Sequence, residues 1–281
     1  YTLTTHRQLY KIKPENTFFN NRNRKGGKLM SKTVIITGAS SGIGREMAKL
    51  LAERGWDLII VARRKALLQE LKKELPCNVS VAVCDLSELK QVRALCRSLN
   101  HEEIDMVINN AGFGDFGLFD ETDEQKEVDM IATNITAVHV LTKYFVKRFK
   151  KANRGYILNV ASIAAFAPGP MMATYYATKS YVLRLSLAIN KELQKAKSRV
   201  RISVLCPGPV KTEFNAVANS SFAIAGMDAK EVAEYAIDQT LKGKQVIFPG
   251  VFTKMAHIAS RLVSTSMASE VVYHIQKARN K

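Results

Sequence analysis

The chain has 281 residues, of which 47% are hydrophobic and 24% are charged, and its formal net charge at pH 7 is +17. Such a composition is typical of one large α/β domain with a sizeable buried core. It excludes an apolar membrane-spanning helix, because no run of about 18 uncharged apolar residues occurs in the sequence.

The positions of the charged residues and cysteines further restrict the classes of protein to which the chain can belong. Lys and Arg are spread along the chain without a dense block interleaved with aromatics, which favours solvated helix faces over a nucleic-acid or lipid surface. The cysteines Cys77, Cys84, Cys96 and Cys206 show no C-x-x-C pairing. We interpret them as reduced thiols of a cytoplasmic protein with no metal site.

Residues 1–29 differ in composition from the rest of the chain. They hold seven Lys or Arg residues against one acid, Glu15, and show no apolar period. This composition predicts a basic, disordered leader. Met30 directly precedes the first predicted strand, so our hypothesis is that 1–29 are translated leader rather than native protein.

From Thr33 onward, short apolar segments alternate with segments of helical periodicity. The predicted strands are 33–36, 58–61, 79–83, 105–108, 156–160, 201–205 and 245–248. The predicted helices are 45–54, 65–75, 89–99, 125–150 and 175–195. In the helix 125–150 we expect Ile131, Ile135, Val138 and Phe145 to face inward. Wholly apolar strands that alternate with helices predict a parallel sheet covered on both faces, over a catalytic domain of residues 30–251.

A glycine turn joins the first strand to the first helix, with Gly38, Gly42 and Gly44 in the spacing G-x-x-x-G-x-G. A strand that enters such a turn and continues as a helix presents backbone N–H groups and the positive helix end to an anion, most often a pyrophosphate. We expect Gly38 to permit the turn, Gly42 to permit close approach of a phosphate, and Gly44 to let the helix pack on the strand.

The tail, residues 252–281, is amphipathic and basic, with Met255, Ile258, Leu262 and Val263 at helical spacing. This pattern predicts a helical tail packed on the domain or on a second subunit. A helix lying on a membrane surface is the alternative.

Further motifs identify a family. The glycine turn TGASSGIG at 37–44 is followed by NNAG at 109–112, by Ser162 after the fifth strand, and by YYATK at 175–179. Their order and spacing closely resemble the short-chain dehydrogenase/reductase family from about residue 32 to 248. The resemblance implies a single doubly wound Rossmann-type domain with about seven parallel strands, a nicotinamide cofactor, and hydride exchange between a carbonyl and an alcohol.

Elementary chemistry supports the same roles for these residues. Reduction of a carbonyl needs a cofactor that supplies hydride and a group that protonates the oxygen. Lys179 lies four residues after Tyr175, on the same helix face, where its charge would lower the phenol pKa. Ser162 can stabilise the charge that grows on the substrate oxygen. Tyr176 lacks a lysine four residues later, so Tyr175 is the preferred acid. Asn134 matches the family's helix asparagine, which positions a water in a proton relay.

The family resemblance assigns the cofactor contacts as follows. Lys179 also holds the nicotinamide ribose, Asp85 and Leu86 lie near the adenine, Asn110 and Ala111 line the adenosine ribose, and Gly112 lets the cofactor pass. The loop 206–212 cups the nicotinamide. The predicted cofactor-binding residues are Gly38, Ser40, Ser41, Gly42, Ile43, Gly44, Arg63, Asp85, Leu86, Asn110, Ala111, Gly112, Tyr175, Lys179, Pro207, Gly208, Val210 and Thr212.

The end of the second strand indicates which dinucleotide is bound. An NAD enzyme would place an acid there to bond the ribose 2′-hydroxyl, but the sequence reads Val-Ala-Arg-Arg at 61–64. The planar, charged guanidinium of Arg63 suits a 2′-phosphate. We therefore predict NADP(H) rather than NAD(H).

The expected substrate is a moderately apolar carbonyl or alcohol, because the predicted pocket lacks a charged anchor. Its expected lining is Phe113, Ala164, Phe166, Met171, Met172 and Gly208. The segment 213–227, with Phe214 and Phe222, suits a movable lid. By resemblance, the helices 125–150 and 175–195 would pair across a two-fold axis to give a homodimer or homotetramer. One alternative stays open: a catalytically silent NADP-binding regulator or membrane-surface protein on the same fold.

Overall fold

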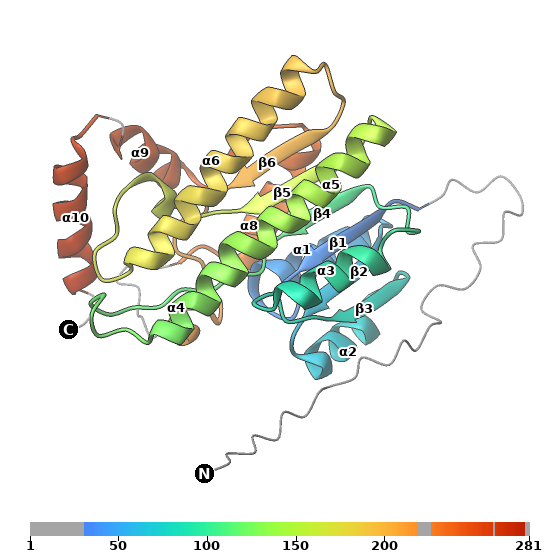
Figure 1. Ribbon diagram of the computed structural model, residues 1–281, viewed down its shortest axis with the longest axis horizontal. Coiled ribbons are helices and arrows are strands. Elements are labelled where there is room, and N and C mark those ends of the chain that lie inside the picture. The colour runs from blue at the N-terminus through green and yellow to red at the C-terminus, as the bar shows by residue number, and fades with distance from the viewer. Residues whose placement is uncertain (1–30, 219–225, 261, 279–281) are drawn as a thin grey trace, which may run out of the picture. The chain divides into compact units, whose positions relative to one another are not determined.

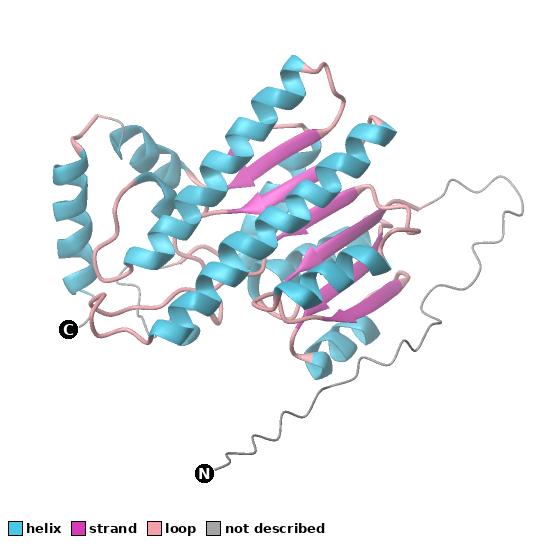
Figure 2. Ribbon diagram, viewed as in Figure 1, coloured by secondary structure: helices cyan, strands magenta, loops and turns pink. Residues whose placement is uncertain are grey.

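A computed structural model describes residues 31–218, 226–260 and 262–278. The expected leader lies outside the described residues, as does Phe222 of the expected lid. Figure 1 shows the arrangement of the elements and Figure 2 their type.

Seven parallel strands form one sheet, as expected. They are β1 (Thr33–Thr37), β2 (Asp57–Ala62), β3 (Val79–Val83), β4 (Met106–Asn109), β5 (Tyr156–Val160), β6 (Arg201–Leu205) and β7 (Val246–Ile247). Their spatial order is β3-β2-β1-β4-β5-β6-β7, and each pair is parallel. The doubly wound Rossmann-type fold is therefore confirmed.

Helices cover both faces of the sheet, and the period-two alternation of the strands explains why. Val34 and Ile36 of β1 point into a core shared with α1 (Gly42–Glu53), α2 (Lys65–Glu74) and α8 (Ala229–Leu241). Ile35 between them points into the opposite core, shared with α3 (Leu89–Ser98), α5 (Val138–Ala152) and α6 (Ala173–Lys195). β1 is therefore apolar on both sides, which is the sequence signature of a covered parallel sheet.

The single helix expected at 125–150 is interrupted. α4 (Glu124–Ile131) passes through a π-helical segment (Ala132–Ala137) into α5. The extra residue in a π turn shifts the phase of the helix, and such turns are frequent at functional sites. The prediction that Ile131 faces inward is wrong: its side chain is 42% exposed, whereas Val138 and Phe145 beyond the π segment are buried.

The C-terminal tail forms two helices, α9 (Val251–Ser260) and α10 (Thr265–Lys277). His257 of α9 stacks on Phe248 and contacts Phe166, and Gln276 of α10 donates to the hydroxyl of Tyr176. Both helices thus contact the domain, at residues close to the loop after β5 and the start of α6. Among the described residues, no helix combines the length and the apolar character needed to cross a membrane.

The strand order reverses between β1 and β4, from which the chain proceeds in opposite directions across the sheet. In such sheets a crevice opens beyond the carboxyl ends of the strands at the reversal point, and ligands bind there. The segments that follow β1 to β6 contain every motif identified in the sequence, so the topology gathers them at one edge.

Candidate functional site

The glycine turn folds as the motif predicts, but the helix begins earlier than expected, at Gly42 rather than at residue 45. Gly38 has φ +67°, and a Cβ there would lie 2.8 Å from the Cα of Ala111. The side chain of Ser41 does not cap α1, and no acid occupies its first turn. The positive end of α1 therefore faces the crevice without an anionic side chain of its own first turn, as a phosphate site requires.

Asn110 holds the turn in place from the neighbouring strand. Its side-chain amide donates to the carbonyl oxygens of Thr37 and Gly38, at 3.0 and 3.2 Å. The hydroxyl of Thr37 in turn accepts from the backbone N–H groups of Asn110 and Ala111. These bonds join the carboxyl ends of β1 and β4. The predicted contact residues Asn110 and Ala111 thus lie at the crevice, with the Asn110 amide occupied by the turn.

The two arginines after β2 have different surroundings. Arg63, the predicted phosphate ligand, is 66% exposed and lies 3.9 Å from the carboxylate of Asp85. Arg64 instead crosses to the glycine turn, where its guanidinium donates to the hydroxyls of Ser40 and Ser41 at 3.2 and 2.9 Å. Arg64 was not among the predicted contacts, because adjacency in sequence does not show which of two arginines turns inward.

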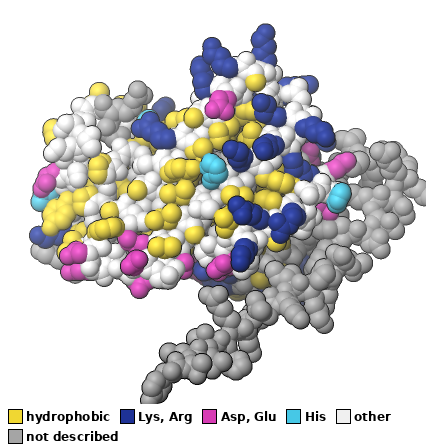
Figure 3. Space-filling model, viewed as in Figure 1, with side chains coloured by type: hydrophobic (Ala, Val, Ile, Leu, Met, Phe, Trp, Pro, Cys, Tyr) yellow, Lys and Arg dark blue, Asp and Glu magenta, His cyan; other side chains and the backbone are white. Residues whose placement is uncertain are grey.

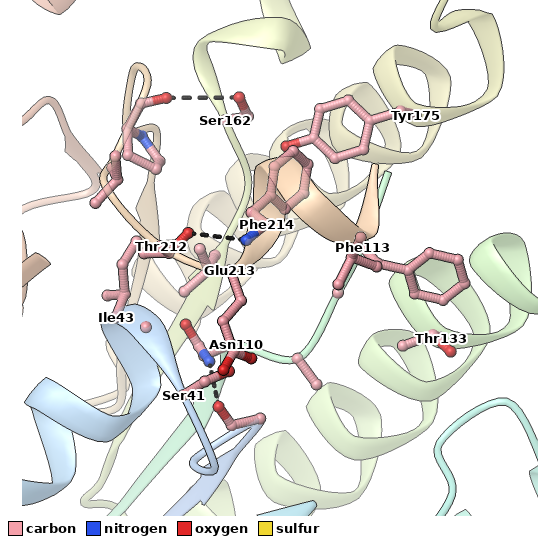
Figure 4. A pocket seen from close by; sticks show the side chains of 18 of the residues that line it. Ser41, Ile43, Asn110, Phe113, Thr133, Ser162, Tyr175, Thr212, Glu213 and Phe214 are labelled. Carbon is pink, nitrogen blue, oxygen red and sulfur yellow. Dashed lines mark hydrogen bonds between the residues drawn. The ribbon is translucent and has the colours of Figure 1, made fainter. Parts of the chain in front are cut away.

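Ser162, Tyr175 and Lys179 come together in the middle of the crevice, and they are 8%, 9% and 5% exposed. Ser162 follows β5 and its hydroxyl lies 3.5 Å from the carbonyl oxygen of Pro207 (Figure 4). Tyr175 and Lys179 lie one turn apart on α6, with the ammonium 5.7 Å from the phenol ring centre. The sequence spacing therefore places three polar groups of the expected types side by side.

Burial determines the protonation of this cluster. The sequence predicted that Lys179 would lower the pKa of Tyr175, but burial instead raises it above the ordinary value of 10, and the hydrogen bond with Ser162 offsets this only in part. Burial lowers the pKa of Lys179 to about 8, and the ammonium donates to the carbonyl oxygen of Val160 at 3.1 Å. At neutral pH the phenol therefore keeps its proton beside a cation that is close to losing its own.

Asn134 lies in the π-helical segment behind this cluster and does not line the cavity. Its side chain brackets Phe113, accepting from the backbone N–H and donating to the carbonyl oxygen, and it donates to Thr178. A Cβ on Gly112 would lie 2.8 Å from the Asn134 oxygen and 3.2 Å from the Lys179 nitrogen. Glycine at 112 therefore leaves open the gap between these two polar groups.

The loop after β6 closes the opposite wall. Val210 pairs with Met227 in an isolated bridge, and the hydroxyl of Thr212 accepts from the backbone N–H of Phe214. α7 (Phe214–Val217) follows, and the ring of Phe214 lies 5.3 Å from that of Tyr175. Figure 4 shows Glu213 and Phe214 crossing between the glycine turn and Tyr175.

One cavity of about 430 Å³ joins these parts. It is lined by all the predicted catalytic and cofactor-binding residues except Gly44 and Asn134, which lie directly behind the wall. The lining also includes Arg64 and Thr133, which were not expected there, and Glu213, Phe214 and Val217 of the expected lid. Arg64 could have been weighed equally with Arg63, whereas nothing in the sequence distinguishes Glu213 from other loop acids.

The end of the cavity next to Tyr175 is apolar. Phe113, Ala164, Met172 and Phe214 belong to one cluster around it. Phe166 and Met171, which were also expected in this lining, are not part of it. Phe166 turns away to pack on Phe248 and His257. Its half-buried position there depends on the tail helix α9, whose place against the domain was not predictable from the sequence.

Comparisons with known proteins place this site in a family. The family model described as short chain dehydrogenase matches residues 32–222. An NADP-dependent 3-hydroxy acid dehydrogenase of Schizosaccharomyces pombe is 37% identical over 202 residues, which cover 68% of this chain and 76% of that protein.

Solved structures agree with this. A short-chain dehydrogenase from Sphingobium yanoikuyae in complex with NADPH has a TM-score of 0.73 and 32% identity, covering 82% of this chain and 91% of that one. The bulky-bulky ketone specific alcohol dehydrogenase from Comamonas testosteroni has a TM-score of 0.70 and 29% identity, covering 85% and 97%. The chain therefore belongs to the short-chain dehydrogenase family of oxidoreductases.

Proposed function

We propose that the protein is an NADP(H)-dependent oxidoreductase that exchanges a hydride between the nicotinamide and the carbonyl or alcohol group of a small, apolar molecule. The observation that carries the proposal is the convergence of Ser162, Tyr175 and Lys179 with the glycine turn on one cavity. The fit of a dinucleotide is supported by the uncapped α1 terminus and by the glycines where a side chain would collide with the wall.

The cofactor supplies the hydride, and the protein residues manage the proton and the charge. Tyr175 is the general acid in reduction: its raised pKa keeps the phenol protonated at neutral pH, ready to donate to the carbonyl oxygen. Ser162 donates a hydrogen bond to the same oxygen as negative charge grows there. In the reverse direction Tyr175 accepts the alcohol proton as general base.

Lys179 has two roles in this proposal. Its charge, close to the phenol, favours the deprotonated form of Tyr175 and so lowers the barrier to proton transfer. Its ammonium also binds the nicotinamide ribose. In reduction a proton reaches Tyr175 from solvent through Lys179 and a water beside Asn134, in the gap that Gly112 leaves open; in oxidation a proton leaves along the same path.

Two observations support NADP(H) rather than NAD(H). The end of β2 has no acid for a ribose 2′-hydroxyl and instead holds Arg63 and Arg64. The guanidinium of Arg64 already binds the hydroxyls of Ser40 and Ser41 at the glycine turn, so a 2′-phosphate would meet a preformed set of donors. A relative described as NADP-dependent and a similar structure solved with NADPH agree with this choice.

The lining supports a substrate without a charged group. Among the described residues that line the cavity, the cations are Arg63, Arg64 and Lys179, and none belongs to the apolar cluster beside Tyr175. A carboxylate such as that of a 3-hydroxy acid would find no partner in that cluster. We therefore propose an apolar ketone or secondary alcohol rather than the acid substrate of the yeast relative.

The remaining expectations belong to the same proposal. We propose a homodimer or homotetramer that pairs through α5 and α6, and a cytoplasmic, reducing location. All four cysteines are free, which suits a reducing compartment.

Steady-state oxidation of NADPH against a panel of ketones and aldehydes tests the function. We expect turnover of apolar ketones, and a loss of at least about 100-fold in kcat for Tyr175→Phe. NADPH binding, followed by its fluorescence, should persist in that variant. A protein that binds NADPH but reduces no carbonyl would instead be the silent regulator.

A further inference from the structure

Arg64 and Glu213 form an ion pair across the mouth of the cavity. Arg64 follows β2 and Glu213 follows β6, yet a guanidinium nitrogen lies 2.8 Å from a carboxylate oxygen. The same guanidinium nitrogen donates to Ser40 and Ser41 of the glycine turn. The pair therefore joins the loop after β6 to the end of the cavity where two predicted phosphate contacts lie.

The surroundings of the Glu213 carboxylate are those of an anion site. The hydrogen bond from Arg64 holds the pKa of Glu213 below its ordinary value, and hydrogen bonding with Ser41 contributes. Glu213 is therefore ionised at neutral pH. A guanidinium together with serine hydroxyls is also the donor set that suits a phosphate.

We propose that Glu213 lowers the preference of the enzyme for NADP(H) over NAD(H) by occupying, in the empty enzyme, the place at Arg64 that the 2′-phosphate of NADP(H) takes when it binds. This inference rests on the function proposed above. Two anions at one guanidinium repel each other, so the phosphate must displace Glu213. NADH carries only a hydroxyl at that position and leaves the ion pair intact. Glu213 thus weakens the binding of NADPH but not of NADH.

Glu213 is also connected through the chain to the other end of the cavity. Glu213 lies between Thr212, which accepts a hydrogen bond from the Phe214 backbone, and Phe214, whose ring contacts Tyr175. Figure 4 shows the Glu213 side chain directed toward Ser41 and Asn110 while Phe214 is directed toward Tyr175. Glu213 is therefore followed directly in the chain by a residue whose ring packs on Tyr175.

Equilibrium titrations of NADPH and NADH fluorescence with the full chain test the inference. Glu213→Gln keeps the shape of the side chain and removes its charge. We expect it to tighten NADPH binding by about two- to fivefold, the range of an exposed ion pair, and to change NADH binding less than twofold. Glu53→Gln is the matched control. It removes one negative charge from the exposed last residue of α1, at the end opposite the glycine turn, and should alter neither constant.

A double-mutant cycle with Arg64→Gln adds a second readout, because Glu213→Gln should have no effect on either cofactor once Arg64 is absent. Unchanged or weaker NADPH binding by Glu213→Gln would overturn the inference, and so would equal tightening of both cofactors. A wild-type protein that binds neither dinucleotide would overturn the proposed function and this inference with it.

Discussion

Arg63 and Arg64 show how strongly the role of a residue depends on its direction. Both are arginines at the end of β2, but only Arg64 reaches the serine hydroxyls of the glycine turn. We predict that Arg64→Gln weakens NADPH binding by about 10-fold or more, since hydrogen bonds to charged groups contribute about 1.5–3 kcal/mol.

Arg63→Gln is the matched comparison. Its guanidinium lies 3.9 Å from Asp85 and is largely exposed, so its loss should weaken NADPH binding only a few-fold. Isothermal titration of both variants with NADPH and NADH measures the difference. A larger loss of NADPH affinity in Arg63→Gln than in Arg64→Gln would show that Arg63 binds the 2′-phosphate, as the sequence alone predicted.

Lys179 makes stability depend on pH with a defined sign. Its pKa falls from an ordinary 10.5 to about 8 in the folded protein. Below pH 8 the lysine is charged in both the folded and the unfolded protein, so burial of the ammonium lowers the free energy of unfolding. Between pH 8 and 10.5 the unfolded state binds more protons, so that cost disappears as pH rises.

We therefore predict that the wild type gains stability relative to Lys179→Met as pH rises from 7 to 10.5, by up to about 3 kcal/mol. Urea unfolding of both proteins at several pH values measures this difference, and titrations shared by the two proteins largely cancel in it. A difference that stays constant with pH would show that the Lys179 pKa is not lowered.

Among the helices and strands, the π-helical segment (Ala132–Ala137) has the clearest role in supporting the site. It places Asn134 so that its amide satisfies both backbone groups of Phe113 and reaches Thr178 on α6. Asn134 is 1% exposed, so its removal leaves buried polar groups without partners.

Asn134→Ala should destabilise the fold by about 1–3 kcal/mol, the cost of unsatisfied buried groups. It should also lower kcat more than it raises the KM for NADPH, because the Gly112–Phe113 backbone lies beside Lys179. Thr136→Ala, in the same segment but half-buried, is the control and should change either quantity little. If both variants had equal effects, the side chain of Asn134 would have no specific role in positioning the Gly112–Phe113 backbone.

The helices and strands that could be predicted from the sequence are those with a strong local signal. The apolar segments clearly indicated strands. For three of them, at 79–83, 156–160 and 201–205, the predicted first and last residues are those of the structure. α8 was missed although Asp228 caps it by accepting from Lys230 and Glu231, and an acid three residues after such a cap is a recognised helix start. The π segment carries no such signal, because its extra residue depends on what packs against it.

The candidate site divides in the same way. Ser162, Tyr175 and Lys179 were predictable because fixed spacings on β5 and α6 bring them together. The Arg64–Glu213 pair was not, because it joins segments 149 residues apart through the order of the strands. Contacts across a parallel sheet become visible only when the topology is known.

At the scale of the whole molecule, the high positive charge bears on the proposed dimer. α5 and α6 lie on the same side of the sheet and are joined by a hydrogen bond between His139 and Tyr181. Lys and Arg side chains gather over these helices on the face seen in Figure 3. The exposed ones include Lys143, Lys147, Lys150, Arg184 and Lys191. Pairing through this face would bring two copies of one basic surface together.

We therefore predict that dimerisation strengthens with ionic strength. Salt reduces the reach of exposed charges from roughly 10 Å at 0.1 M to 3 Å at 1 M, and so reduces the repulsion between the two surfaces. Sedimentation equilibrium between about 0.05 and 0.5 M NaCl measures the dissociation constant. In the variant Lys143→Gln/Lys147→Gln the dimer should be tighter at low salt and depend less on it. A dimer that weakens with salt would place the interface elsewhere, and a monomer at every salt concentration would remove it.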